Sequence, residues 1–363
     1  MKIVVGLSGG VDSSVAAALL KEQGHEIVGV TMQLCDKDNP HPGKGCFCAS
    51  QLGEIEMAKK VAAKLGIPHY VIDCHKEYAD TIMKYFHDEY LAGKTPNPCV
   101  RCNAEFKFGL LPKLIEKEIG PYDKFATGHY ARIVNSNGNI RLAIAVCKEK
   151  DQSYFLSQLT TKQLEKVIFP LGEIESKEKV RNLARKYGFE TADKKDSMDF
   201  YSGNKAELVE DESFEIVRSE CIGGSVVDVH GNKIGMHGGY WKYTVGQRHG
   251  FSCKSTVPMY ILKILPERNE LVVGPVEEAC KGHFKIKNIN WLIDYSDEAN
   301  TGKCNIKIRS NGKFNRGYVV NYDIDMMLDD NIIMDEPVFG VTPGQLAVAY
   351  DDNGHVICSG YIC

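Results

Sequence analysis

A run of seven residues near the start of the chain, Ser8-Gly9-Gly10-Val11-Asp12-Ser13-Ser14, carries residue types that bind phosphate. Paired glycines let backbone N–H groups approach an anion because no Cβ stands in the way. The run follows an apolar segment typical of a strand, Lys2 to Leu7, and precedes a segment typical of a helix, Ser14 to Gln23. A helix N-terminus adds unpaired N–H donors and a partial positive charge, so the sequence predicts a phosphate cradle here.

The predicted cradle is not a Walker A loop, because the Gly-Lys-Ser/Thr ending is missing from the run. The pattern Ser-Gly-Gly-x-Asp-Ser resembles instead the pyrophosphate loop of the ATP pyrophosphatase superfamily. That resemblance implies cleavage of ATP to AMP and pyrophosphate, with adenylation of a substrate oxygen. A plain glycine turn before a helix is the alternative interpretation.

A second segment with chemical potential is Thr95-Pro96-Asn97-Pro98-Cys99-Val100-Arg101-Cys102-Asn103. The two prolines stop the preceding helix, and the two cysteines open a new one. A thiol at a helix N-terminus is more acidic, which favours a thiolate nucleophile. A structural zinc pair and two inert thiols are the alternatives. A zinc site needs a matching second pair, and the nearby Cys46-Phe47-Cys48 has poor spacing for one.

Composition restricts the class of protein. The chain has 363 residues, of which 43% are hydrophobic and 25% charged, as is ordinary for a globular protein. The net charge of −4 excludes a globally basic nucleic-acid binder, so any RNA contact must come from local patches. No apolar run approaches the ~20 residues of a membrane span. The N-terminus begins directly on a strand-like segment, so we expect a cytoplasmic protein whose 13 cysteines are thiols, catalytic residues or metal ligands.

Strand-like and helix-like segments alternate in the first half of the chain. Predicted strands cover Glu26–Met32, His69–Ile72 and Lys124–Thr127, and predicted helices cover Gln51–Leu65, Glu77–Leu91 and Phe106–Ile119. This order predicts a doubly wound parallel sheet with helices on both faces. Ligands of such sheets bind at the carboxyl ends of the strands, so the loops after Leu7, Met32 and Thr127 should surround one crevice.

The second half of the chain has a different pattern. Thr160 to Tyr187 reads as helical with a break at Pro170-Leu171-Gly172, and glycines punctuate short β-like runs beyond Ser202. From Gly282 to Cys363 short strands are joined by Asn, Gly and Asp turns, which predicts a small β-barrel. We therefore expect an α/β nucleotide-binding domain over residues 1–205, a small central β-rich domain over 206–278 and a C-terminal β-barrel over 279–363.

Further motifs follow in a fixed order, and together they resemble the bacterial tRNA 2-thiouridylase family nearly end to end. This likeness implies the three-domain architecture predicted above. The motifs after the phosphate loop and Thr-Pro-Asn-Pro are Ala126-Thr127-Gly128-His129-Tyr130-Ala131-Arg132, Lys150-Asp151-Gln152-Ser153-Tyr154-Phe155-Leu156, Lys194-Lys195-Asp196-Ser197, Thr244-Val245-Gly246-Gln247-Arg248 and Val341-Thr342-Pro343-Gly344-Gln345.

The resemblance implies that sulfur replaces the C2 oxygen of a tRNA wobble uridine. ATP adenylates that oxygen with Mg²⁺ offsetting the phosphate charge, and a donor protein supplies sulfur as persulfide or sulfide. The implied catalytic residues are Cys102, the nucleophile, with Cys99 and Asp12. The implied ATP contacts are Gly6, Leu7, Ser8, Gly9, Gly10, Val11, Asp12, Ser13, Met32 and Gly128. The implied tRNA contacts are Asn97, Pro98, Cys99, His129, Lys150, Asp151, Gln152, Arg309, Ser310 and Gln345.

The chain departs from the family in its cysteines. Many members have a second catalytic cysteine in a segment like Asp-Ser-Thr-Gly-Ile-Cys-Phe, where this chain reads Asp196-Ser197-Met198-Asp199-Phe200-Tyr201-Ser202. Cys99 stands where many relatives have Asp. Either Cys99, Cys46 or Cys48 replaces the missing thiol, or three cysteines hold a [4Fe–4S] cluster that carries sulfide. The candidate ligands are Cys99, Cys102, Cys46 and Cys48, with Cys35 as a further option.

Two other classes of function remain as alternatives. One is an adenylating ligase or sulfurtransferase that acts on a small molecule, and the other is an ATP- or metal-sensing module without chemistry. Support for RNA from the residues alone is modest. It consists of basic side chains in the C-terminal region, whose alternative interpretation is a solvated barrel face: Lys281, Lys285, Lys287, Lys307, Arg309, Lys313 and Arg316.

Overall fold

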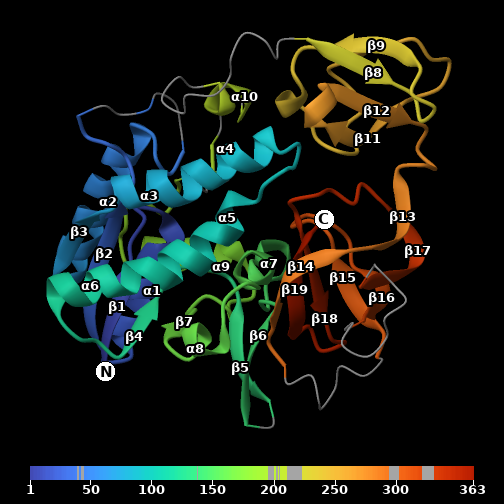
Figure 1. Cartoon of the computed structure of the whole chain (residues 1–363). Helices are drawn as coiled ribbons and strands as arrows, with labels where there is room; N and C mark the ends of the chain where they lie inside the picture. The colour runs from blue at the N-terminus through green and yellow to red at the C-terminus, as the bar shows by residue number, and fades with distance from the viewer. Residues whose placement is uncertain are drawn as a thin grey trace. The chain divides into compact units, whose positions relative to one another are not determined.

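The computed structural model in Figure 1 describes residues 1–38, 41, 45–136, 138–194, 200–201, 203, 205–210, 223–293, 302–320 and 331–363. It forms two compact units. The first unit comprises Met1–Thr81, Cys99–Gly203 and Gly354–Val356, and the second comprises Ile82–Pro98, Asn204–Asn353 and Ile357–Cys363. Of the sequence motifs, residues 195–199 and Ser202 lie outside the described residues. The three predicted domain boundaries stay predictions.

A five-stranded parallel sheet forms the centre of the first unit. Its strands run in the order β3-β2-β1-β4-β7, with bounds His69–Asp73, Glu26–Gln33, Lys2–Gly6, Lys124–Ala126 and Val167–Ile168. The apolar residues Ile3, Val4 and Val5 of β1 are fully buried, as expected for a central parallel strand. The predicted α/β class is confirmed, and the adjacent strands β2, β1 and β4 end at one edge of the sheet.

Helix α1, Val11–Glu22, directly follows the phosphate loop and is buried on more than one side. Ala17 and Leu20 pack with β1 and α2, Ser50–Leu65, whereas Val15 and Ala16 pack toward α9, Lys177–Lys186. A helix that is apolar on several faces belongs in a core. This packing holds the loop in front of α1 in a fixed place.

The sequence predicts one continuous helix over Glu77–Leu91, and the structure divides this stretch. It contains α3, His75–Tyr78, a π-helical stretch η1, Ala79–Met83, and α4, Lys84–Leu91. A second π-helical stretch, η2, covers Cys102–Leu110 between α5, Pro98–Arg101, and α6, Leu111–Ile119. π-Helical turns are rare and often mark functional sites, and η2 begins at the predicted nucleophile.

The helical prediction for Thr160–Tyr187 is wrong in its middle. Val167 and Ile168 form β7 and pair with Phe125 and Ala126 of β4. A short apolar run does not by itself distinguish a strand from a helix. Here the run forms a strand because it pairs with the edge of β4. The remaining elements of the first unit are the hairpin β5, Arg132–Ser136, with β6, Asn139–Ala143, the 3₁₀ turn η3, Lys148–Lys150, and the short helices α7, Ser153–Leu156, and α8, Thr161–Leu164.

The second unit contains two further sheets. The first has the order β10-β9-β8-β12-β11. Its strands are β8, Gly224–Val227, β9, Lys233–His237, β10, Ser252–Cys253, β11, Tyr260–Leu265, and β12, Glu270–Gly274, accompanied by α10, Lys205–Val209, and the 3₁₀ turns η6, Tyr240–Lys242, and η7, Pro266–Arg268. The glycine-rich β pattern beyond Ser202 is thereby confirmed.

The second sheet of this unit has seven strands in the order β13-β17-β16-β15-β18-β19-β14. Its recorded strand pairs are antiparallel, and its core includes Phe284, Ile306 and Cys358. The predicted C-terminal β-structure is confirmed. The bounds are β13, Cys280–Phe284, β14, Ile286–Trp291, β15, Cys304–Lys307, β16, Asn315–Val319, β17, Ile332–Phe339, β18, Leu346–Tyr350, and β19, Val356–Ile362.

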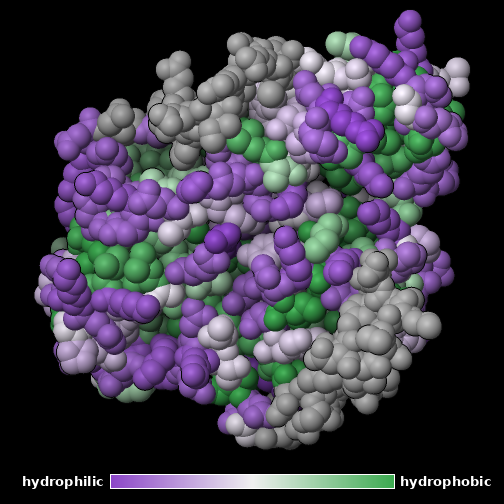
Figure 2. Space-filling model, in the orientation of Figure 1, coloured by the Kyte–Doolittle hydropathy of each residue, from purple (hydrophilic) through white to green (hydrophobic). Residues whose placement is uncertain are grey.

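Hydrophilic residues predominate on the face of the protein shown in Figure 2. Within the described ranges, every helix is too short or too polar to cross a membrane.

Candidate active site

The phosphate loop lies between β1 and α1, as predicted, and its hydroxyl groups hold its shape. Oγ of Ser13 accepts a hydrogen bond from the backbone N–H of Ser8 at 3.1 Å, and the two Oγ atoms are 3.2 Å apart. Gly9 has φ +69°, and a Cβ there would lie 2.2 Å from the carbonyl oxygen of Glu54. The loop therefore needs glycine at this position, and its backbone can approach an anion closely.

The carboxylate of Asp12, a predicted catalytic residue, is held by two partners. Nζ of Lys177 lies 2.8 and 2.7 Å from Oδ1 and Oδ2 of Asp12, and the Tyr130 hydroxyl donates to Oδ1 at 2.7 Å. Lys177 is the first residue of α9, which Ser176 caps with its side chain. Sequence reasoning missed Lys177; its only local signal is the position after a capping serine.

A second cation reaches the loop from Lys194. Its Nζ donates to the carbonyl oxygen of Gly9 at 3.1 Å and lies 3.5 Å from Oε1 of Glu54. This lysine belongs to the Lys194-Lys195-Asp196-Ser197 motif, which by itself predicts no role for it. Together Lys177 and Lys194 place positive charge beside a loop without a Walker lysine, which suits a polyphosphate.

The remaining predicted ATP contacts lie at or just beyond the ends of β1, β2 and β4 and at the start of α1. Leu7 and Val11 are buried core residues, and Met32 is half-buried near the end of β2. A Cβ on Gly6 would lie 3.3 Å from the ring of Phe125. A Cβ on Gly128 would lie 2.6 Å from the backbone nitrogen of Ser13, so Gly128 packs directly against the phosphate loop. Their ATP contacts stay predictions.

His129 follows Gly128 and is half-buried among aromatic rings. Its Nδ1 is 2.7 Å from Oγ1 of Thr127. Burial, followed by the positive charge of Lys107, lowers the pKa of His129 well below its usual value. The imidazole is therefore neutral at pH 7, which leaves hydrogen bonding rather than charge as its means of contacting RNA.

Of the predicted thiols, Cys46 contacts the hydroxyl group of Tyr78, and Cys99 and Cys102 lie near enough to act on it electrostatically. This hydroxyl lies 3.1 Å from Sγ of Cys46. Burial raises the pKa of Tyr78 most, and negative charge at Cys46, Cys102 and Cys99 raises it further. Burial also raises the pKa of Cys46 most, and Cys102 is the next contributor. The first unit therefore brings Cys46 into the environment of the Cys-x-x-Cys pair.

The expectation of an acidic Cys102 thiol is wrong. α5 is a single turn, and burial raises the pKa of Cys102, whereas the positive charge of Lys107 lowers it. Desolvation of a thiolate outweighs the effect of so short a helix. Lys107 also donates from Nζ to Oδ1 of Asn103 at 3.1 Å. Cys102 is thus a protonated thiol at rest with a cation as neighbour.

The other two candidate thiols, Cys48 and Cys35, have different surroundings. Sγ of Cys48 lies 3.8 Å from Nδ1 of His41, and burial followed by the charge of Cys35 raises its pKa to about 11. In the part of the chain that the structure describes, no group of three or more His, Cys, Asp or Glu is arranged to hold a metal ion. The four predicted cluster ligands are therefore divided between two environments, and the cluster stays a prediction.

The Lys150-Asp151-Gln152 segment forms hydrogen bonds within the first unit. Oδ1 of Asp151 accepts from the backbone nitrogen of Ala145 at 3.0 Å, and Oε1 of Gln152 accepts from that of Tyr130 at 2.9 Å. Tyr130 in turn binds Asp12, so this segment supports the phosphate loop. Lys150 is half-buried. Contact of these three residues with tRNA stays a prediction.

The remaining predicted tRNA contacts lie in the second unit, apart from Cys99 in α5. Gln345 hydrogen-bonds Thr95, and its Oε1 accepts from Nδ2 of Asn97 at 3.5 Å. Nη2 of the exposed Arg309 donates to the Phe339 carbonyl at 2.8 Å, and Ser310 is half-buried. Pro98 begins α5 and is buried.

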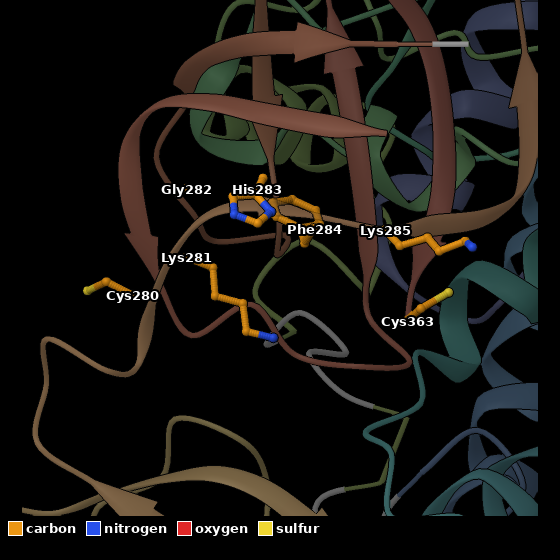
Figure 3. Close-up of a pocket in the computed structure, with 7 residues that line it drawn as sticks. All are labelled: Cys280, Lys281, Gly282, His283, Phe284, Lys285 and Cys363. Atoms are coloured by element: carbon orange, nitrogen blue, oxygen red, sulfur yellow. The ribbon is translucent and has the colours of Figure 1, made fainter. Parts of the chain in front are cut away.

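Figure 3 shows a pocket on β13 that contains none of these residues. Its volume is 390 Å³, and Lys281 and Lys285 extend from it in different directions. The backbone nitrogen of Cys363 donates to the Lys285 carbonyl at 3.0 Å. Two of the predicted basic residues, Lys281 and Lys285, therefore line this pocket.

Three family models together match most of the chain. They are described as a tRNA methyl transferase HUP domain, matching residues 1–201, a tRNA methyl transferase PRC-barrel domain, matching 215–275, and an aminomethyltransferase beta-barrel domain, matching 281–362.

Curated relatives match over nearly their full lengths, and each is called tRNA-specific 2-thiouridylase MnmA. The relative from Endomicrobium trichonymphae is 40% identical, covering 97% of this chain and 96% of its own. That from Rickettsia massiliae is 40% identical, covering 96% and 93%. That from Wolbachia pipientis subsp. Culex pipiens is 38% identical, covering 100% and 95%. With the phosphate loop and the thiol group in place, this chain belongs to the MnmA family of tRNA-specific 2-thiouridylases.

Proposed function

We propose that this chain is a tRNA sulfurtransferase that replaces the C2 oxygen of a wobble uridine by sulfur, with ATP as the activating substrate. The observation that carries the proposal is the presence, in one compact unit, of a phosphate loop and of Cys46 in contact with Tyr78, whose pKa the charges of Cys102 and Cys99 also raise. One site activates an oxygen and the other delivers sulfur. Membership in the MnmA family supports tRNA as the substrate.

Activation is necessary because a carbonyl oxygen on a uracil ring leaves poorly. In the proposed first step, the C2 oxygen attacks the α-phosphorus of ATP, and pyrophosphate leaves. Backbone N–H groups at Gly9 and Gly10 and the Ser8 and Ser13 hydroxyls would bind the phosphates. Lys177 and Lys194 add positive charge there. Asp12 is the acidic side chain of the loop and is paired with Lys177, and Mg²⁺ would offset phosphate charge when bound with ATP.

Cys102 would deliver the sulfur in the second step. The terminal sulfur of a Cys102 persulfide attacks C2, a sulfur–carbon bond forms, and AMP leaves with the former C2 oxygen. Burial raises the pKa of Cys102, and the charge of Lys107 opposes this effect, which favours an anionic sulfur there. Burial and the same Lys107 charge lower the pKa of His129, so this neutral side chain is available as a hydrogen-bonding group near Lys107.

The test is tRNA thiolation in anaerobic buffer, measured by nucleoside mass spectrometry together with AMP release. We expect 2-thiouridine and AMP from the chain with unmodified tRNA, ATP, Mg²⁺ and a persulfide donor, without added iron. Cys102→Ala should still release pyrophosphate but form neither AMP nor 2-thiouridine, because AMP leaves only when sulfur attacks C2, whereas the matched control Cys253→Ser, at a half-buried thiol of β10, should behave as wild type.

Three results would contradict parts of this proposal. Product formed only after reconstitution with iron and sulfide would establish the cluster as carrier instead of a persulfide. ATP consumption that does not depend on tRNA would favour a small-molecule substrate. Absence of both AMP and 2-thiouridine from wild type would reject the function itself.

A further inference from the structure

Cys46 lies against the segment where this chain lacks a cysteine. Gly45 forms an antiparallel bridge with Tyr201, and Sγ of Cys46 lies 3.9 Å from the carbonyl oxygen of Phe200. Counting from Asp196, Tyr201 occupies the position of the cysteine in Asp-Ser-Thr-Gly-Ile-Cys-Phe. The chain therefore has no thiol at Tyr201, but it has one at Cys46, on the segment that pairs with Tyr201.

Aromatic packing connects Cys46 with the helix of Cys102. The Tyr78 hydroxyl contacts Sγ of Cys46, and the Tyr78 ring packs edge-on against Phe106 with centroids 5.4 Å apart. Phe106 stands four residues after Cys102, slightly less than one turn of the π-helical stretch η2, so the two residues lie toward the same side of it. Tyr78 is 1% exposed, so Cys46 and the Cys102 face of η2 meet at a buried position.

Ring contacts fix the turn that carries Cys46. The ring of Phe47 lies 5.2 Å from that of Phe200 and 6.0 Å from that of Tyr201, measured between centroids. The same ring stacks on Tyr78 at 6.4 Å. Cys48 follows Phe47 in the sequence, and its Sγ lies near His41. This packing therefore gives Cys46 and Cys48 different surroundings.

The proposed sulfur transfer requires electrons that Cys102 alone does not supply. After attack, C2 is bonded to a sulfur that is still bonded to Cys102. Releasing a thione breaks this sulfur–sulfur bond with both electrons moving to the sulfur on C2. A second thiol must therefore attack Sγ of Cys102 and form a disulfide with it, because water does not supply the two electrons that the transferred sulfur gains.

We propose that Cys46 is the resolving thiol of the sulfur-transfer site, which attacks Cys102 and releases the thiolated uridine. This role rests on the function proposed above. Sγ of Cys46 forms a bond to Sγ of Cys102, the bond between Sγ of Cys102 and the transferred sulfur breaks, and the uridine leaves as 2-thiouridine. Cys46 and Cys102 are oxidised to a disulfide, and the transferred sulfur is reduced. The Cys46 proton passes to solvent, and an external dithiol reductant restores both thiols.

A single turnover of the full chain tests this assignment. The enzyme is loaded with glutathione persulfide, desalted, and mixed anaerobically with an unmodified tRNA transcript, ATP and Mg²⁺ without reductant. Wild type should release 2-thiouridine tRNA and gain a Cys46–Cys102 disulfide, read by non-reducing peptide mass spectrometry. This readout needs no variant.

The variant Cys46→Ser should stop one step earlier. It should release AMP and accumulate a covalent protein–tRNA adduct through Cys102, which dithiothreitol converts to 2-thiouridine tRNA. A merely structural role for Cys46 would not produce an adduct that an external thiol rescues. The control Cys253→Ser should match wild type.

Several results would overturn the assignment. These are release of product by Cys46→Ser without added thiol, a wild-type disulfide that maps to Cys99 or Cys48 instead, arrest by Cys48→Ser, and product that requires reconstituted iron. In each of them wild type still thiolates tRNA, so the proposed activity survives. Failure of wild type to form AMP and 2-thiouridine rejects the activity and this role together.

Discussion

Nε2 of Gln345 donates hydrogen bonds to the carbonyl oxygens of Thr95, at 2.9 Å, and Pro96, at 3.2 Å. The backbone nitrogen of Thr95 donates to the carbonyl of Pro343 at 2.9 Å. Gly344 has φ +89°, and a Cβ there would lie 2.9 Å from the Thr95 carbonyl oxygen. Two motifs far apart in the sequence thus form one packed structure in the second unit, and Gln345 holds the segment that leads to Asn97.

We predict that Gln345→Glu, which keeps the shape but removes both donors, lowers kcat/KM for tRNA. Two net hydrogen bonds at about 1 kcal/mol each correspond to a loss of roughly tenfold or more. The measurement is initial-rate thiolation at varied tRNA concentration. Asn353→Asp, an exposed amide-to-carboxylate change, is the matched control. Equal rates for both variants would show that the Thr95 segment needs no such support.

The ion pair between Lys177 and Asp12 gives a prediction about ATP. Lys177→Met should leave the Asp12 charge uncompensated beside the phosphate loop, which repels a polyanion. Because a hydrogen bond to a charged group is worth about 1.5–3 kcal/mol, KM for ATP should rise roughly tenfold or more. AMP release at varied ATP measures this effect. Lys179→Met, two residues later with an exposed ion pair to Glu175, is the control and should leave KM unchanged.

Gly128 gives a prediction about close packing. In Gly128→Ala the new Cβ would lie 2.6 Å from the Ser13 nitrogen and 2.7 Å from the Asp12 carbonyl carbon, both backbone atoms. Such overpacking costs about 1–3 kcal/mol, so thermal stability should fall and AMP release should drop. Gly53→Ala, in α2 with nothing within 4 Å of its Cβ, should instead stabilise the chain by about 1 kcal/mol. Equal melting temperatures for the two variants would contradict the clash.

Glu210 gives a prediction about pH. Its carboxylate accepts from Nε1 of Trp241 at 3.1 Å and pairs with Lys242 at 2.8 Å. The hydrogen bond from Lys242, more than that from Trp241, lowers the pKa of Glu210 below 4.5. Because the folded form holds the carboxylate ionised, the stabilisation is present above pH 4.5 and is lost as pH falls through the lowered value.

Urea unfolding followed by Trp fluorescence measures this effect, since the chain has only two tryptophans. Glu210→Gln should be less stable than wild type at pH 7 by under about 1 kcal/mol, because the pair is partly exposed. The difference should shrink as pH is lowered below 4.5. Glu336→Gln, at an exposed position of β17, should show no such dependence. A gap that widens on acidification would reverse the assigned sign.

The sequence alone determined the features that depend on neighbouring residues. The Gly9-Gly10 pair between a strand and a helix predicts a phosphate loop because glycine conformation and helix termini are local properties. Strand and helix segments in the first half were predicted by apolar periodicity, and the parallel sheet followed from their alternation. Its motif predicts Cys102 as the nucleophile, and this role stays a prediction.

The tertiary structure alone decided which distant residues meet. Val167 and Ile168 became a strand because β4 offered a free edge, which no local pattern reveals. Lys177 reached Asp12 because α9 packs on α1. Burial reversed the expected acidity of Cys102, and the contact of Cys46 with Tyr78 separated it from Cys48 two residues away. Such pairings depend on desolvation and long-range packing, which arise only when the whole chain has folded.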